Sequence, residues 1–322
     1  MQKEIKTPKL LITANNFDNF KTLCEDTQVD GIIIGIKTVT NKANYKYSLE
    51  ELPDLINISN HTNKEIYINI DDHIHETELE NLTNILSYLH KLKIKNIIFN
   101  DYAIAQIDFE NNYQFNLIYN SQTLVTNYGQ LEFYSKNNIN NVFLPNELTR
   151  YELADFGKNK NNVKLFKQIS GYQFMMESRW HLISTFAKMN NIKDDLTNRK
   201  LMLKERKRDY SSNILENEKG TCIYTGYNLS LISYIDILID LNIDYFVIDN
   251  FMHDDVWTIK TANIYLKAIT LIKEGKYNAS KQKLLEEEKD INKPVELSPG
   301  FFNGKVEDLK YVPLNVKGEA NE

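Results

Sequence analysis

Cysteine is scarce in this chain of 322 residues, which contains only Cys24 and Cys222. Two cysteines cannot form a disulfide framework. They also fall short of the four thiolates that hold an iron–sulfur cluster or a four-cysteine zinc site, so we expect no such cofactor in this chain. Cysteine usage of this kind is typical of a reducing compartment, and we therefore expect a cytoplasmic protein.

Long apolar runs are missing as well. None approaches the roughly 18 residues that would indicate a membrane span, and the N-terminus shows neither the apolar core nor the cleavage pattern of a signal peptide. The formal net charge of −6 argues against bulk, non-specific binding of nucleic acid, although it leaves room for a local basic patch.

The sequence also lacks the common catalytic motifs. It contains no GxSxG elbow, HExxH motif or P-loop, and no GxGxxG turn follows the first predicted strand, which argues against a Rossmann fold. Ser178 and Ser184 each lie three positions from His181, and on a helix such residues are neighbours. Because this spacing arises often by chance, we do not predict a Ser–His nucleophile.

What the chain does have is a regular alternation of short apolar runs and helical patterns. The runs lie at residues 9–14, 31–36, 65–70, 96–101, 115–120, 141–146, 163–169 and 244–250. Nearly continuous apolar runs are typical of parallel strands covered on both faces. Eight of them predict an α/β protein with a (β/α)8 TIM-type barrel, complete or distorted, over residues 1–275.

The alternation of strands and helices is interrupted once, between the seventh and eighth strands. Residues 171–242 there predict a long helical insertion. In such barrels it would leave from the C-terminal rim, where active sites lie. It begins with "GYQFMMESRWHLISTF" (171–186), in which Phe174, Met175 and Met176 are expected to pack. Residues 276–322 form a C-terminal tail, rich in lysine and glutamate at first. Its "VELSPGFFNGK" segment predicts either a loop folded back onto the domain or a disordered tail.

Polar side chains follow most of the predicted strands. They are Asn15, Asn69, Asn100, Asp101, Asn120, Gln122, Asn146, Glu147, Asp249 and Asn250. Such residues at the carboxyl ends of barrel strands are suited to binding a ligand, although Asn and Asp are also preferred helix caps. We expect Asp101 and Glu147 to act in catalysis and Asn15, Asn69, Asn100, Gln122, Asn146 and Asp249 to bind substrate.

Three further segments each allow two interpretations. In "DDHIHETE" (71–78), His73 and His75 would share a metal ion on an extended chain, but acidic residues also favour the first turn of a helix, and we predict no metal. "YNSQTLVTNY" (119–128) would contact a phosphate or carboxylate, or Ser121 or Thr123 would cap a helix.

The third segment is the basic stretch "TNRKLMLKERKRDY" (197–210). Its basic residues are Arg199, Lys200, Lys204, Arg206, Lys207 and Arg208. They would form either a face that contacts nucleic-acid phosphates or a solvated helix surface.

Several segments, taken in order, resemble peptidase family U32, the collagenase-like peptidases. They include "IIFNDYAI" (97–104), "EKGTCIYTGYNLSLISYIDILIDLNIDYFVIDNF" (218–251) and, most specifically, "LVTNYGQLEFYSKNNINNVFLPNELTRYEL" (124–153). Where many members carry a cysteine-rich "SGRC.LS" motif, this chain reads "SGYQFMMESRWHLIS". Gly171, Ser178, Arg179, Leu182 and Ser184 fit that outline, whereas Trp180 and His181 stand where a cysteine is expected.

The resemblance implies a barrel fold and a bacterial origin. Family members are described as peptidases, while others act in tRNA uridine, rRNA cytidine or ubiquinone hydroxylation, several with an iron–sulfur cluster on four cysteines. The short, cysteine-poor form looks like the smaller of two paralogues linked to tRNA uridine hydroxylation. The resemblance thus implies a larger U32 partner, tRNA as substrate and prephenate as hydroxyl donor.

Three functions follow as hypotheses. The first is a factor in wobble-uridine 5-hydroxylation, in which rim residues including Arg179, His181, Tyr172 and Ser178 bind a small acid, with Arg179 and His181 catalytic. The second is a peptidase, for which only the 71–78 cluster offers a metal-activated water. The third is a non-catalytic binding subunit that has kept the barrel as a scaffold.

Overall fold

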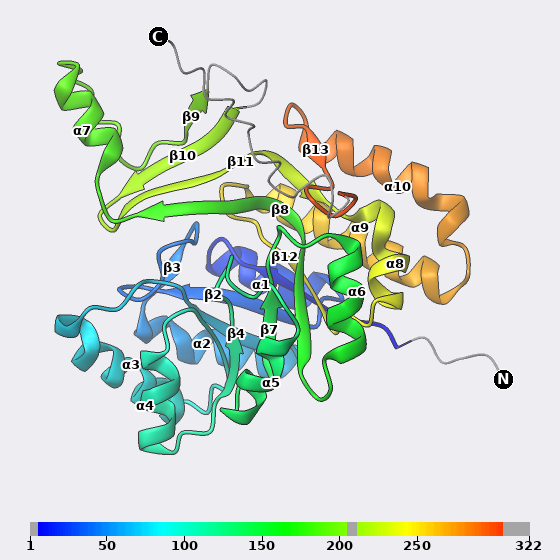
Figure 1. Cartoon of the computed structure of the whole chain (residues 1–322), viewed down its shortest axis with the longest axis horizontal. Helices are drawn as coiled ribbons and strands as arrows, with labels where there is room; N and C mark the ends of the chain where they lie inside the picture. The colour runs from blue at the N-terminus through cyan, green and yellow to red at the C-terminus, as the bar shows by residue number, and fades with distance from the viewer. Residues whose placement is uncertain (1–5, 205–210, 305–322) are drawn as a thin grey trace, which may run out of the picture.

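The structure is a computed structural model that describes residues 6–204 and 211–304. Eight parallel strands form a barrel in it: β1 (Lys9–Thr13), β2 (Gly31–Ile36), β4 (Glu65–Ile70), β5 (Asn96–Phe99), β6 (Asn116–Tyr119), β7 (Asn141–Leu144), β8 (Lys164–Ser178) and β12 (Tyr245–Ile248). Strand β12 pairs with both β1 and β8, which closes the ring (Figure 1). The predicted barrel and its eight strands are confirmed.

The strands are apolar on both sides because both sides are covered. Inward-facing side chains fill the barrel, where the Phe166 ring stacks on Tyr245 with centroids 4.0 Å apart. Outward-facing side chains pack against α1 (Phe17–Asp26), α2 (Leu52–Thr62), α3 (Leu79–Lys91), α4 (Ala103–Asn111), α5 (Gly129–Lys136), α6 (Arg150–Asn159), α8 (Ile235–Asp240) and α9 (Asp255–Lys273). Within the described part of the chain, no helix is long and apolar enough to cross a membrane.

The described part of residues 171–242 contains more strand than helix, so the prediction of a helical insertion is wrong in its secondary structure. Strand β8 continues past the rim and pairs antiparallel with β11 (Gly220–Ser230), which pairs with β10 (Ser211–Asn217) and through it with β9 (Leu201–Lys204). Between β8 and β9 lies one short helix, α7 (Leu182–Met189). Many residues of β9 and β10 are only partly buried. Their sequence therefore shows neither the two-residue period of a half-buried strand nor the 3.6-residue period of an amphipathic helix.

The outer part of β8 crosses the mouth of the barrel. Strand β8 lies opposite β4 in the ring, yet Glu177 near its end reaches His73, just after β4, with Oε2 3.7 Å from Nε2. Figure 1 shows β8 running above the barrel towards α7, with β11 beside it. We call residues 171–178 of β8, together with β11, the roof.

The remaining described elements complete the fold. They are β3 (Lys46–Tyr47), β13 (Leu297–Ser298), α10 (Tyr277–Asn292) and three 3-10 turns at Leu49–Glu51, Glu76–Glu78 and Ile232–Tyr234. Residues 277–304 lie against the barrel: α10 packs on α9, β13 pairs with β11, and the Phe302 side chain is buried. The loop alternative for the "VELSPGFFNG" segment is therefore confirmed, while residues 305–322 lie outside the described part.

Helix α10 carries a fully buried carboxylate, Glu288, which accepts hydrogen bonds from Ser170, Ser230 and Tyr265. Burial raises its pKa from about 4.5 to about 7. The folded protein therefore holds a proton that the unfolded chain releases between these values. Stability should fall as the pH rises through this window, by about 3 kcal/mol in all.

Replacing Glu288 with glutamine is expected to remove that dependence, since an amide does not titrate. Urea unfolding of both proteins at several pH values between about 4.5 and 7.5 measures how the free energy of unfolding depends on pH. Equal slopes of stability against pH in the two proteins would contradict the prediction.

Candidate functional site

A small cavity lies at the mouth of the barrel, beneath the roof, where the carboxyl ends of the strands meet. Its volume is about 90 Å³. The polar side chains that line it include Asn69, Asn120, Gln122, Asn146, Gln168 and Asp249. The structure therefore brings together four residues that the sequence analysis assigns to substrate binding: Asn69, Gln122, Asn146 and Asp249.

Some of these groups hold one another in place. The Asn146 amide donates to Gln168 Oε1 at 2.7 Å, and the Gln168 amide donates to the Tyr172 carbonyl at 2.9 Å. The Asn69 amide donates to Asp71 Oδ2 at 2.9 Å. One side of the cavity wall is thus fixed by hydrogen bonds within the protein.

Asp249 is the one titratable side chain among the described lining residues. Its Oδ1 accepts the Phe251 N–H at 3.0 Å. Burial, together with the negative charge of nearby Asp71, raises the pKa of Asp249 to about 6. At neutral pH this carboxyl is mostly ionised and acts as a hydrogen-bond acceptor.

Ionic contacts attach the roof to the rim of the barrel. Glu177 forms an ion pair with Lys42 at 2.7 Å, with both side chains more than 90% buried, and accepts a hydrogen bond from Asn41 at 2.7 Å. Lys219, just before β11, pairs with Asp72 and Glu78. These contacts hold Phe174, midway along the roof strand, over the cavity.

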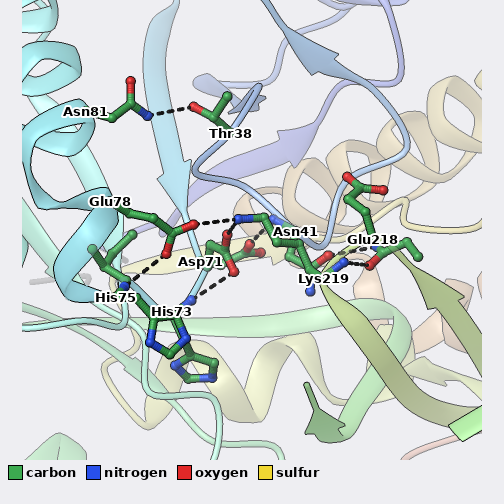
Figure 2. Close-up of polar contacts among 12 residues, drawn as sticks. Thr38, Asn41, Asp71, His73, His75, Glu78, Asn81, Glu218 and Lys219 are labelled. Carbon is green, nitrogen blue, oxygen red and sulfur yellow. Dashed lines mark hydrogen bonds and ion pairs between the residues drawn. The ribbon is translucent and has the colours of Figure 1, made fainter. Parts of the chain in front are cut away.

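The 71–78 segment is used for these loop contacts. Asp71 accepts the Asn41 N–H at 2.6 Å, and Glu78 accepts the His75 N–H at 2.9 Å in a capping box, so the helix-start interpretation is confirmed for His75 and Glu78 (Figure 2). Asp71 and Asp72 are buried rather than solvated, contrary to that interpretation. Residues 6–204 and 211–304 contain no group of three or more His, Cys, Asp or Glu suited to a metal ion.

Three other strand-end residues hold loops around the mouth. Asn15 donates to Asp255 at the start of α9 at 2.9 Å, and Asn100 donates to the Asp71 carbonyl at 2.9 Å. Asp101 accepts two backbone N–H groups, one of them at the start of α4. None of the three lines the cavity.

Tyr172 and Glu147 lie beside the cavity rather than in it. The Tyr172 ring stacks on His253, with centroids 4.8 Å apart, and its hydroxyl accepts from Lys200 at 2.8 Å. Glu147 is exposed and lines a neighbouring groove with Phe174.

In the 119–128 segment, neither Ser121 nor Thr123 caps α5, since that helix begins at residue 129.

Arg179 and His181 lie in the turn between β8 and α7, where both are exposed and neither lines the cavity. The helical face that would join Ser178, His181 and Ser184 does not exist, because Ser178 ends a strand and α7 begins only at residue 182. The Ser184 hydroxyl instead donates to the buried carboxylate of Glu216.

The basic segment 197–210 contains strand β9, so the interpretation of this segment as a solvated helix surface is wrong. Arg199, Lys200 and Lys204 are exposed, and the Lys200 ammonium lies over the Tyr172 ring, 4.2 Å from its centroid. Arg206, Lys207 and Arg208 lie outside the described residues.

The two cysteines do not fit an iron–sulfur cluster. Cys24 packs in the outer core around α1, and Cys222 packs in a separate small core beneath the roof. Burial is the main cause that raises the pKa of the Cys222 thiol to about 12, beside Glu177. A protonated, isolated thiol is neither a metal ligand nor a nucleophile at neutral pH.

Sequence reasoning missed the residues that place the roof, above all Lys42, Phe174 and Glu177. Phe174 was assigned to packing, and Lys42 carried no local signal. One signal was available: a carboxylate inside a mixed apolar stretch, as in "QFMMESR", is often buried against a distant cation.

The sequence matches the model of peptidase family U32 over residues 15–310. It is 23% identical over 306 residues to tRNA hydroxylation protein P2 of Bacillus subtilis (strain 168), covering 92% of this chain and 98% of that protein. Among solved structures, it resembles a U32 peptidase with 12% identity and a TM-score of 0.49, covering 77% of this chain and 95% of that one. It also resembles the N-acetylneuraminate lyase of Proteus mirabilis with 9% identity and a TM-score of 0.47, covering 88% and 80%.

The family match spans most of the barrel and the whole roof. The segments that resemble the family in sequence form β5, β7, β11 and β12 with parts of their helices, and therefore contribute to the mouth and to the roof. The chain belongs to peptidase family U32.

Proposed function

We propose that this chain is a subunit in the 5-hydroxylation of the wobble uridine of tRNA and acts with a larger, cysteine-containing member of its family. The observation that carries the proposal is the end-to-end similarity to tRNA hydroxylation protein P2, which this chain matches over 98% of that protein's length. Such a function would place the protein in the cytoplasm with its tRNA.

The chemistry of the reaction supports a partner. Replacing the C5–H of uridine by C5–OH removes two electrons from the base, so an oxidant must accept them. Clusters that exchange electrons are held by four cysteines in proteins of this kind, and this chain has two that lie apart. We propose that prephenate supplies the hydroxyl group, as hydroxide, and that the redox centre of the partner passes the two electrons from the base to an external electron acceptor, while the C5 proton is released.

The outer end of the roof offers a surface for such a partner. We call it the outer patch, and it consists of the exposed side chains of Met176, Trp180, Leu182, Phe186, Met189 and Leu203. Trp180 and Met189 are 77% and 78% exposed. Apolar groups of this size, rich in Met and aromatic residues, mark protein interfaces.

Phosphate contacts would come from the basic segment next to this patch. Arg199 lies just before β9 and Lys204 is the last residue of that strand, and both are exposed. A local cluster of cations can attract tRNA even though the net charge of the chain is −6. We propose that residues 199–208 contact the tRNA backbone.

Deleting the gene in its own strain tests the function. The 5-hydroxylated wobble uridine and its derivatives should disappear from total tRNA, as measured by mass spectrometry of nucleosides, and return when the gene is restored. An unchanged nucleoside profile, in a strain that has no second copy, would exclude the proposal.

Replacing Phe186 with serine is expected to prevent the return of the modified nucleoside and to lower copurification of the larger family member at least about tenfold, since exposed aromatic anchors dominate interfaces. Phe133→Ser is the matched control, because Phe133 on α5 and Phe186 on α7 are both 60% exposed. Equal effects of the two substitutions would contradict a specific role of the outer patch.

A further inference from the structure

The cavity at the barrel mouth carries no positive charge among its described lining residues. The cations nearby are already engaged by protein groups. Lys42 pairs with Glu177 and lies over the Phe174 ring, 4.8 Å from its centroid, while Lys167 donates to Asn146 Oδ1 and, at 3.2 Å, to the Pro145 carbonyl. Asp249 adds a negative charge to the wall. An anion placed here would lose its hydration without gaining a counter-charge, so the cavity favours an uncharged ligand.

The cavity is apolar below and above. Its floor consists of Ile33, Ile98, Phe143 and Val247, the upper inward-facing side chains of the barrel. Its cover is the Phe174 ring, which is held edge-on against Tyr224. A flat ring fits between two such surfaces, because its faces are apolar and its edge is free to form hydrogen bonds.

The walls offer both donors and acceptors at that edge. The Gln122 side chain and the Asn120 amide nitrogen donate to no described residue, and Asn69 Oδ1 accepts from none. Asp249 keeps acceptor positions besides the one that the Phe251 N–H uses. Donors therefore come from the β6 side, and acceptors come from β4 and β12.

We propose that this cavity binds the uracil ring of the nucleotide to be modified. A uracil ring is flat and uncharged. It carries both an N–H donor and carbonyl acceptors, and the walls offer partners of both kinds: acceptors from β4 and β12, and donors from the β6 side. The volume of about 90 Å³ is several times the space that one buried water needs, and it suits a single ring rather than a whole nucleotide. The ribose and phosphates would remain outside, and prephenate, with two carboxylates, would bind elsewhere.

This inference rests on the proposed function but is tested apart from it. The purified full chain is titrated with uridine, 3-methyluridine, orotidine and prephenate, and binding is followed by ligand-observed NMR. We expect uridine to bind. We expect 3-methyluridine, which lacks the N–H donor, and orotidine, which carries a carboxylate on the ring, to bind at least about tenfold more weakly.

Two variants locate the binding. Gln122→Leu should weaken uridine binding about fivefold to tenfold by removing free polar atoms from the wall. Gln114→Leu should leave it unchanged, because Gln114 has a similar positive φ (58° against 65°) but precedes β6 at the opposite end of the barrel. A parallel thermal unfolding measurement shows whether both variants are folded.

Lack of uridine binding at millimolar concentration would overturn the inference, as would equal binding of uridine and orotidine or equal effects of the two variants. If the deletion strain loses the modified nucleoside while uridine fails to bind, the function stands and the assignment of the cavity falls. If uridine binds while the nucleoside profile is unchanged, the cavity still binds a uracil ring but the proposed function falls.

Discussion

Replacing Lys42 with methionine is expected to lower the free energy of unfolding by about 3–5 kcal/mol, because it leaves the Glu177 carboxylate buried without its partner. The ion pair is 2.7 Å long, and the two side chains are only 6% and 8% exposed. Burial by itself would lower the pKa of Lys42, but the charges of Asp71 and Glu177 outweigh it and raise the pKa above its usual value. The lysine is therefore charged in the folded protein at neutral pH.

A double substitution separates the ion pair from the loss of packing. Lys42→Met combined with Glu177→Leu removes both charges and should recover most of the stability, since an apolar pair of similar volume often replaces a buried ion pair at little cost. Urea unfolding of the single and double variants gives the coupling energy. Additive effects of the two substitutions would show that the pair does not hold the roof.

The consequence for the cavity follows from the position of the pair. Glu177 is three residues beyond Phe174 on the same strand, so releasing it frees the strand that covers the mouth. Hydrogen exchange in the Lys42→Met variant should therefore increase along β8 beyond Gly171 and along β11 before it increases in the barrel strands.

The barrel strands could be predicted from the sequence because each is a nearly continuous apolar run, which is what burial on both faces requires. The lining of the mouth could be predicted for a related reason. Polar residues at the carboxyl ends of parallel strands converge, so Asn69, Gln122, Asn146 and Asp249 meet although they are far apart in the chain.

The roof could not be predicted in the same way. Its strands are stabilised by pairing with one another and by a few long-range contacts, such as that between Asn41 and Glu177, which are 136 positions apart. Neither feature leaves a local period in the sequence. The assumption of a helix also placed Arg179 and His181 at a substrate-facing rim, whereas the strand carries them past the mouth to an exposed turn.

Gly171 is the residue at which β8 leaves the barrel, and replacing it with alanine is expected to cost at least about 3 kcal/mol. Its φ is +107°, and an added Cβ would lie 1.9 Å from the Asp249 carbonyl oxygen, so the backbone of β8 or β12 would have to move. Gly275→Ala is the matched control, because Gly275 also has a positive φ, +71°, but an added Cβ there meets nothing within 4 Å. The control should cost only about 1 kcal/mol.

The same substitution is expected to impair the cavity, because Asp249 lies in its wall and Phe174 is only three residues beyond Gly171. Moving either strand displaces one of them. Urea unfolding measures the loss of stability, and the nucleoside profile of a strain that carries Gly171→Ala measures the loss of function. If Gly171→Ala costs no more than Gly275→Ala, the close approach of β8 and β12 does not fix the position of the roof. If the roof moves while the modified nucleoside persists, the mouth is not the site where the base is held.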